Sequence, residues 1–390
     1  MNGRRTAAVG AVATAAAATV TGAALTATAV TFARAVVTPR RHKPDDLDVL
    51  QVGPRRVVLS ATADTVVPGR YGVWTDGGRG HFRVGDVLGA DEDRVTRELL
   101  AVDSGVPAPG AGRWNQYYFA GDPTAALGLA HEDVLVPSEV GALPCWSVPG
   151  PAEGASHTWA VLVHGRGATR EEALRAVPVL HDLGLPCLVP AYRNDADAPE
   201  AEPGLYGLGD TEWRDVEAVA RYALDRGARR LLLVGWSMGG AIVLQLVARS
   251  ALAGHVAALV LDGPVVDWFD VLDHQARQAG VPVRLGRLGL QLLGHPVGRR
   301  LVGLAGPVDL RAMDWVRRAE ELALPVLLLH SDADDYVPSG PSQRLAQARP
   351  DLITYVASST ARHTKEWNVD PQGWESAVRE FLAPRPGDAA

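Results

Sequence analysis

Short apolar runs alternate with segments of helical apolar spacing from residue 159 to the end of the chain. The runs are mostly hydrophobic without alternation, which is typical of strands that are buried on both faces. We expect these strands at 159–163, 187–190, 230–235, 256–261, 326–330 and 352–356. Helices are expected between them, at 170–183, 211–226, 238–251, 339–348 and 371–382. The alternation predicts an α/β fold with a mostly parallel central sheet flanked by helices.

A different pattern precedes this region. Residues 45–140 are rich in Val, Gly and aromatic side chains, and no amphipathic helix stands out among them. Turn residues separate short strand candidates, which lie at 57–59, 71–74, 81–84 and 114–119. We expect a β-rich N-terminal extension over 45–140, followed by the α/β domain over 141–385.

One connection in the α/β region is much longer than the others. About 60 residues separate Asp262 from Pro325, and they carry helical apolar spacing at Val281, Leu285 and Leu288. A long insertion between two strands is often a lid over a site. We therefore expect a helical cap at 264–320. An extra packing layer without a gating role is the alternative.

The N-terminal 44 residues form a further unit, which we expect to be a hydrophobic anchor or export signal followed by a linker. Residues 6–33 contain no charge, and 13 of these 28 residues are Ala and seven are Thr. A stretch of this length predicts an uncleaved membrane anchor with a single N-terminal hydrophobic helix. A cleaved export signal and a disordered Ala/Thr-rich tail are the alternatives. Basic residues on both flanks leave the orientation open.

Composition narrows the classes of protein that remain. Charged residues make up 21% of the chain, the net charge is -7 and the mean hydropathy is +0.01, which excludes a disordered chain and a polytopic membrane protein. The absence of a basic cluster in the body argues against nucleic acid as a partner. Cys145 and Cys187 each lie in an apolar run, so we expect neither a disulfide framework nor a metal site.

A serine stands between an expected strand and an expected helix. The motif G-W-S-M-G occupies residues 235–239, with Ser237 at its centre. Such a sharp turn presses its flanking residues together, so only very small residues fit at Gly235 and Gly239. The turn exposes the Ser237 hydroxyl and directs the Met238 amide toward an oxygen that becomes negative in acyl transfer. The motif predicts a nucleophile.

A second glycine-rich turn, H-G-R-G at residues 164–167, ends the first strand of the parallel series. A backbone N–H at this place commonly completes an oxyanion hole, which favours the amide of Arg166. Alternatively, the glycines only let the chain turn. We expect His164 to be a structural hydrogen-bonding residue. The turn at 192–195 ends another strand, where it lines the pocket or is held by its own hydrogen bonds.

An acidic loop follows the strand at 326–330. Of its three aspartates, we favour Asp334 as the group that orients a catalytic imidazole, and Asp332 and Asp335 are the alternatives. Asp262, at the end of the strand before the insertion, is a further candidate. The base must come after the last strand, where His363 is the only histidine.

Together these motifs resemble the α/β-hydrolase fold superfamily, in its serine hydrolase branch of esterases, lipases and proline-peptidase-like enzymes. The likeness covers roughly residues 141–384, and Ser331 and Arg362 depart from it by standing where glycine is common. The resemblance implies a mostly parallel sheet, a Ser–His–Asp triad and no cofactor. It assigns the nucleophile Ser237, the acid Asp334, the base His363 and the oxyanion amides of Arg166 and Met238.

The resemblance implies a serine hydrolase that cleaves carboxylic esters of small molecules through an acyl-enzyme. Specificity is expected from the cap at 264–320, whose apolar residues favour an acyl or aromatic group. An aminopeptidase or amidase is an alternative, for which Asp267, Asp270 and Asp273 offer acidic groups unless they form a solvated helix face. A non-catalytic binding protein that keeps the fold is another. The oligomeric state stays open.

Overall fold

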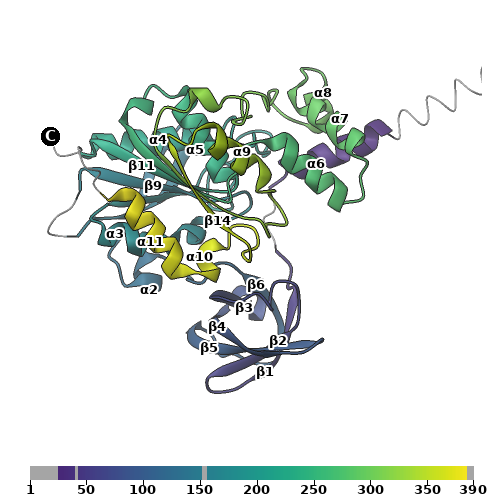
Figure 1. Cartoon of the computed structure of the whole chain (residues 1–390), viewed down its shortest axis with the longest axis vertical. Coiled ribbons are helices and arrows are strands. Elements are labelled where there is room, and N and C mark those ends of the chain that lie inside the picture. Colours follow the sequence, from purple (N-terminus) through teal and green to yellow (C-terminus); the bar gives the residue numbers. More distant parts are fainter. Residues whose placement is uncertain (1–24, 40–42, 152–155, 384–390) are drawn as a thin grey trace, which may run out of the picture.

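An eight-stranded sheet forms the centre of the molecule, in a computed structural model that describes residues 25–39, 43–151 and 156–383 (Figure 1). Its spatial order is β14-β13-β12-β11-β9-β10-β8-β7. The pairs that join β10, β9, β11, β12, β13 and β14 are parallel, and β8 and β7 add antiparallel strands at one edge. The strands are β7 (Glu132–Ser138), β8 (Gly141–Val148), β9 (Thr158–Val163), β10 (Cys187–Pro190), β11 (Arg230–Trp236), β12 (Val256–Asp262), β13 (Val326–Ser331) and β14 (Ile353–Ser358).

Helices cover both faces of this sheet because its strands are apolar on both faces. Leu231 and Leu233 of β11 pack with α4 and α5, whereas the alternate residues Leu232 and Val234 pack with α3 and α11. The prediction of an α/β fold with a mostly parallel sheet is therefore confirmed. The helices around the sheet are α3 (Val177–Asp182), α4 (Trp213–Asp225), α5 (Met238–Arg249), α9 (Gly340–Ala348), α10 (Glu366–Val369) and α11 (Pro371–Leu382).

The helix expected at 170–183 differs from the prediction. It is divided into a 3₁₀ turn, η2 (Arg170–Arg175), and the α-helix α3. Pro178 lies in the first turn of α3, where its missing N–H and fixed φ are tolerated, but the same ring would clash inside one continuous helix. The six strands expected in the parallel series all have ends within two residues of those predicted.

The N-terminal extension contains a closed six-stranded barrel, with the order β1-β2-β5-β4-β3-β6. Alternate residues point inward, so that Val57 and Leu59 of β2 are buried while their neighbours contact solvent. The sequence predicts parts of four of these strands but neither β1 nor β5. The strands are β1 (Leu47–Val52), β2 (Arg56–Ser60), β3 (Tyr71–Thr75), β4 (Gly80–Ala90), β5 (Arg94–Ser104) and β6 (Gly110–Asn115).

A fully buried arginine holds one loop of the barrel. The guanidinium of Arg97, on β5, donates to the carbonyl oxygens of Thr65, Val67, Gly69 and Gly85. Burial lowers the pKa of Arg97 to about 10. The first three of these carbonyls belong to the loop between β2 and β3, which contacts the α/β domain.

The insertion before β13 forms a cap of three helices, α6 (Trp268–Gln278), α7 (Val283–Gly294) and α8 (Gly298–Val302). A further helix, at residues 25–37, packs beside it, as the purple ribbon near α6 and α7 shows (Figure 1). A Cβ atom at Gly289 would lie 2.9 Å from the carbonyl oxygen of Ala29. Glycine therefore allows α7 and the N-terminal helix to approach closely.

The helix at residues 25–37 includes the end of the segment that the sequence assigns to an anchor or export signal. Residues 6–24 of that segment lie outside the described residues. In the part of the chain that the structure describes, no helix is both long and apolar enough to cross a membrane. Ala33, Val36 and Val37 instead join the hydrophobic core that contains α4 and α5. A location at a membrane or outside the cell stays a prediction.

Candidate active site

The motif G-W-S-M-G forms a tight turn between β11 and α5. Ser237 has φ 52° and ψ -116°, which is a strained conformation for a residue with a side chain. A Cβ atom at Gly235 would lie 2.7 Å from the backbone of Gly239, and one at Gly239 would lie 2.0 Å from the Val163 carbonyl oxygen. Only glycine fits at either position, which is the steric reason for the motif.

The structure brings the predicted nucleophile, base and acid together. His363 Nε2 lies 2.9 Å from Ser237 Oγ, and His363 Nδ1 lies 2.7 Å from Asp334 Oδ2. The other oxygen of Asp334 accepts hydrogen bonds of 2.8 Å from the amides of Tyr336 and Val337. These bonds fix the carboxylate, which in turn orients the imidazole toward the serine.

Electrostatics support this arrangement. Burial alone would raise the pKa of Asp334, but the nearby imidazoles of His363 and His330 hold that pKa well below its usual range. Burial alone would lower the pKa of His363, but the Asp334 carboxylate raises it above its ordinary value. The carboxylate therefore stays ionised and stabilises the imidazolium that a proton transfer from Ser237 would create.

The H-G-R-G turn at the end of β9 lies directly against the serine. A Cβ atom at Gly165 would be 3.1 Å from the Cβ of Ser237. Among the described residues, nothing accepts a hydrogen bond from the N–H of Arg166, which follows Gly165, or from that of Met238, the first residue of α5. Both amides are therefore available to an oxyanion beside Ser237, although their use as donors stays a prediction.

A buried glutamate that the sequence analysis did not single out supports this turn. Glu172 accepts hydrogen bonds from the Gly165 amide at 2.7 Å and from the Gln116 amide group at 3.2 Å. Burial alone would raise the pKa of Glu172, but Arg175 and these donors lower it. In the sequence, Glu172 looks like a solvated residue of an amphipathic helix. Only its position in space shows that it holds the turn.

His164 has the structural role that the sequence predicts. It is fully buried, stacks on Tyr192 at 4.4 Å, and bonds Asp195 at 2.9 Å and the Gly165 carbonyl at 3.0 Å. Burial would lower the pKa of His164, but Asp195 raises it to about 9. A protonated His164 donates from both ring nitrogens, and so links the 192–195 turn to the H-G-R-G turn.

The other candidate acids lie elsewhere. Asp332 is exposed, and Asp335 forms an ion pair with Arg362. Asp262 is buried and accepts a hydrogen bond of 2.8 Å from the indole of Trp374. Among the described residues, none of the three bonds the imidazole that contacts the serine. Asp334 alone of the four candidates takes this place.

A small pocket of about 180 Å³ opens beside the serine. Its walls come from parts of the chain that are distant in sequence: Lys43 of the N-terminal linker, Gln116 of the segment after the barrel, the 165–168 turn, and Tyr336 and Thr364. No residue of the 264–320 insertion lines this pocket. The structure thus differs from the expectation that the cap contacts the substrate.

The barrel reaches the residues on both sides of His363. Asp64, in the loop between β2 and β3, forms ion pairs with Lys365 and, at 3.3 Å, with Arg362. Arg362 also pairs with Asp335, next to the acid. Arg362 is one of the two departures from the family pattern, and its partners explain why a long basic side chain stands where glycine is common.

A buried asparagine makes the second contact between the barrel and this loop. The side-chain amide of Asn368, in α10, donates to the carbonyls of Arg70 at 2.6 Å and Gln116 at 2.8 Å. Its side-chain oxygen accepts from Arg175, which also donates to the Thr364 carbonyl. The loop that carries the imidazole is therefore held by the barrel and by η2 together.

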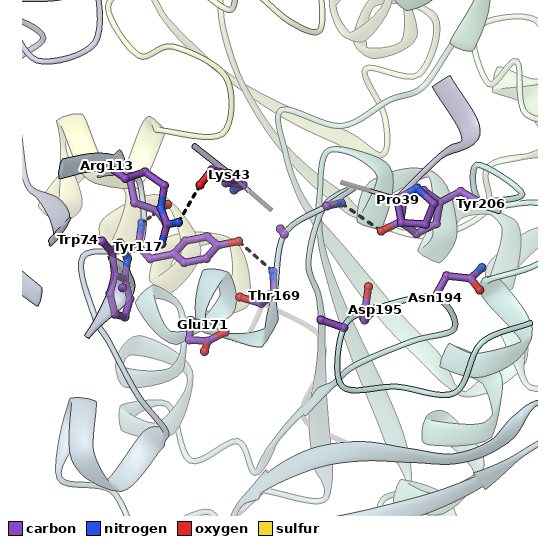
Figure 2. Close-up of a pocket in the computed structure, with 15 residues that line it drawn as sticks. Pro39, Lys43, Trp74, Arg113, Tyr117, Thr169, Glu171, Asn194, Asp195 and Tyr206 are labelled. Atoms are coloured by element: carbon purple, nitrogen blue, oxygen red, sulfur yellow. Dashed lines mark hydrogen bonds between the residues drawn. The ribbon is translucent and has the colours of Figure 1, made fainter. Parts of the chain in front are cut away.

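A larger space, the interdomain cavity, lies between the barrel, the linker and the α/β domain (Figure 2). It measures about 320 Å³ and shares Lys43, Gly167 and Ala168 with the pocket beside the serine. Asn194 and Asp195 line it, so the 192–195 turn both faces a cavity and is held by its own hydrogen bonds.

The cap encloses a third cavity, of about 810 Å³, which none of the triad residues lines. The three aspartates considered for an amine-binding site line it, and each has another role. Asp267 caps α6, Asp270 pairs with Arg344, and Asp273 pairs with Arg287. Their distance from the triad pocket gives the aminopeptidase alternative no specific support.

Comparisons with known proteins agree with this architecture. Residues 160–281 match the family described as alpha/beta hydrolase fold, and residues 48–115 match a domain of unknown function. An uncharacterized protein of Mycobacterium tuberculosis is 28% identical over 263 residues, which cover 67% of this chain and 82% of the relative. The match of residues 48–115 indicates that the barrel occurs as a unit in other proteins, but it assigns no activity to the barrel.

An esterase from Pyrococcus furiosus is among the similar solved structures. Two of its crystal forms give TM-scores of 0.52 and 0.51 at 18% and 19% identity, covering 68% and 67% of this chain and 94% and 95% of the esterase. At this identity the likeness shows the fold alone. With the family match and the sheet order, it establishes that the domain carrying Ser237 has the α/β-hydrolase fold, as the sequence motifs predict.

Proposed function

We propose that this chain is a serine hydrolase that cleaves carboxylic esters of small molecules. The observation that carries the proposal is the hydrogen-bonded chain from Asp334 through His363 to Ser237, at a strained strand-to-helix turn. Two unused amides beside the serine and the esterase among the structural neighbours add support.

The proposed reaction has two steps. His363 takes the proton of Ser237 as its oxygen attacks the ester carbonyl, and the oxyanion accepts from the amides of Arg166 and Met238. His363 then gives this proton to the leaving alcohol, which leaves an acyl-enzyme. In the second step His363 takes a proton from water as the water oxygen attacks the acyl carbon. The bond from that carbon to Ser237 Oγ then breaks, His363 returns the proton to Oγ, and the carboxylic acid leaves.

A fluorophosphonate probe tests the nucleophile. We expect one adduct on Ser237 of the full chain and none on Ser237→Ala, whose kcat should fall by about 10⁴-fold or more. Ser138→Ala, at the last residue of β7, is the matched control and should keep both labelling and activity. Labelling that survives Ser237→Ala would refute the assignment.

A substrate panel tests the reaction class. We expect 4-nitrophenyl esters of short acids to be hydrolysed and aminoacyl 4-nitroanilides to be cleaved far more slowly, because the described residues place no unpaired carboxylate in the pocket beside the serine to hold a substrate amine. Faster turnover of the anilides would favour the aminopeptidase alternative.

A further inference from the structure

The interdomain cavity adjoins the pocket of the proposed reaction. Lys43, Gly167 and Ala168 line both this cavity and the pocket beside Ser237. The two volumes, about 320 and 180 Å³, together are large enough for a small organic ester. A substrate held at Ser237 would therefore extend past Lys43 into the space between the two domains.

Two cationic side chains on one side of this space lack an anionic partner. Lys43 Nζ stands 5.3 Å over the ring of Tyr117, and Arg113 donates to the Lys43 carbonyl oxygen at 3.0 Å (Figure 2). In the described part of the chain, no carboxylate lies within 4.0 Å of either cation, and the Arg113 Nε is buried without an acceptor. Removal from water without a counter-charge is costly, so a bound anion would stabilise both groups.

The remaining charges leave this space positive. Glu171 lines it and forms no ion pair among the described residues, so it offsets one of the two cations. Asp195 is bonded to His164, whose raised pKa of about 9 keeps it protonated. Glu172, in the adjoining pocket, forms an ion pair with Arg175 at 3.7 Å, which offsets its charge.

The opposite side of the cavity is polar rather than apolar. Tyr206 accepts from the Gly167 amide at 3.3 Å, and among the described residues its hydroxyl proton has no acceptor (Figure 2). Asp195 is 5% exposed, and its Oδ1 is buried without a partner in the described residues. Such a side accepts hydrogen-bond donors of a ligand and repels an anion, so a negatively charged group would lie on the side of Lys43 and Arg113.

We propose that the interdomain cavity binds a negatively charged group, a carboxylate or a phosphate, at the end of the ester remote from the scissile bond. Lys43 and Arg113 contact this anion, and the cavity thereby selects ester substrates that carry a charge over alkyl esters of the same length. The inference rests on the proposed esterase activity of Ser237, and it places specificity at the barrel rather than at the cap.

Matched esters test the preference. The carboxylate-bearing 4-nitrophenyl hydrogen glutarate is compared with 4-nitrophenyl hexanoate, and we expect kcat/KM to be about tenfold higher for the charged ester. A second pair, 4-carboxyphenyl acetate and 4-methylphenyl acetate, places the anion on the alcohol side. 4-Phosphonophenyl acetate then distinguishes a phosphate-like group from a carboxylate.

Charge removal tests the residues. Lys43→Met and Arg113→Met should each lower kcat/KM for the charged ester by about 10-fold to 100-fold. Arg113→Met should lower kcat/KM for hexanoate by less than about twofold. Lys43→Met also alters a wall of the pocket beside Ser237, so it should lower the value for hexanoate too, but by less than the value for the charged ester. Lys43→Arg should keep the preference. Arg94→Met, which removes an exposed arginine of β5 on the same barrel, is the matched control and should change neither value.

The outcomes separate this inference from the proposed function. Equal hydrolysis of charged and neutral esters, or equal losses on both in Lys43→Met, would overturn the inference and leave the esterase proposal intact. Absence of hydrolysis and of fluorophosphonate labelling would overturn the esterase proposal. If the variants fail to fold, glutarate inhibition of hexanoate hydrolysis by the unaltered protein decides: we expect competitive inhibition that weakens with salt, and no inhibition would refute the anion site.

Discussion

The barrel and the cap both flank the eight-stranded sheet, but they contact the candidate catalytic residues differently. The barrel bonds Arg362 and Lys365 on either side of His363 through Asp64, and a buried amide, Asn368, ties the same loop to the barrel. The cap reaches the acid loop at the carbonyl of Asp335, and it encloses a cavity that no triad residue lines. The barrel, and not the cap, therefore holds the loop that carries His363.

The largest loss of stability is expected from Arg97→Leu, which removes the buried arginine of the barrel. Arg97→Leu leaves the carbonyls of Thr65, Val67 and Gly69 buried without donors, and we expect it to lower the free energy of unfolding by about 3–5 kcal/mol. The loop that carries Asp64 should loosen, so kcat for a neutral ester should fall as well. Urea unfolding and steady-state kinetics measure both effects.

The control for that experiment is Arg94→Leu, which removes an exposed arginine from the same strand and should leave both quantities unchanged. A folded Arg97→Leu protein with an unaltered kcat would break the comparison, because the barrel would then be stable in itself but not coupled to the catalytic loop.

A matched pair of substitutions compares the two additions directly. Asn368→Ala on the barrel side and Leu290→Ala in the cap should each cost about 2–3 kcal/mol, the first through buried groups left unbonded and the second through a cavity. Only Asn368→Ala should lower kcat, by about tenfold, because it releases the loop that positions His363.

Urea midpoints and kcat for a neutral ester check this pair. Equal losses of kcat in the two variants would mean that the cap is coupled to the reaction as closely as the barrel, and the difference between the two additions would disappear.

The sequence predicts the α/β domain and its candidate catalytic residues better than it predicts the barrel and the cap. The strands of the parallel series are continuous apolar runs, and the glycines of residues 235–239 have steric causes that are local in sequence. Asp334 and His363 follow from the chain order of the fold. Each of these signals can be found without knowing which distant segments meet in space.

The barrel side depends on contacts between distant segments. Arg97 lies in β5, a charged segment that the sequence does not predict as a strand, and only closure of the barrel buries it. Lys43 lies in a segment that reads as a linker, and Asp64 reads as a loop residue. The cap shows the converse case, since its apolar spacing predicts its helices but not which cavity they enclose.

Two buried carboxyl groups have raised pKa values, one beside the acid loop and one in the cap. Burial, followed by the nearby Asp262, raises the pKa of Glu366 well above its usual value, and burial raises that of Asp267 in the cap to about 6. Both are harder to ionise in the folded protein than in the unfolded chain. The stability they contribute is present in full below about pH 4 and is lost as the pH rises through each raised pKa, near pH 6 for Asp267.

Glu366→Gln and Asp267→Asn should therefore each remove part of the loss of stability with rising pH, as measured by urea midpoints between pH 4 and 9. Glu366 accepts a hydrogen bond of 3.0 Å from the amide of Ser331, at the start of the acid loop, so only Glu366→Gln should also change the pH dependence of kcat. If Asp267→Asn changes the pH dependence of kcat and Glu366→Gln does not, the group whose ionisation affects kcat lies in the cap.

The smallest effects on kcat come from two ion pairs. Asp64→Asn removes the barrel partner of Lys365 and Arg362, and we expect a cost of at most about 1 kcal/mol, since partly exposed pairs contribute little. Arg287→Ala removes the exposed partner of the buried Asp273 carboxylate in the cap, and we expect this unpaired carboxylate to cost about 1–3 kcal/mol. Stability alone would therefore make the cap pair look the more important.

Kinetics should distinguish them, because Asp64 contacts the residues that flank the base whereas Arg287 contacts none of the triad. We expect kcat for a neutral ester to fall about threefold in Asp64→Asn and to stay unchanged in Arg287→Ala. Asp64→Glu, which keeps the charge, should recover part of the loss. If Asp64→Asn leaves kcat unchanged, the barrel holds the catalytic loop through the buried Asn368 alone, and the ion pairs beside His363 only cover its surface.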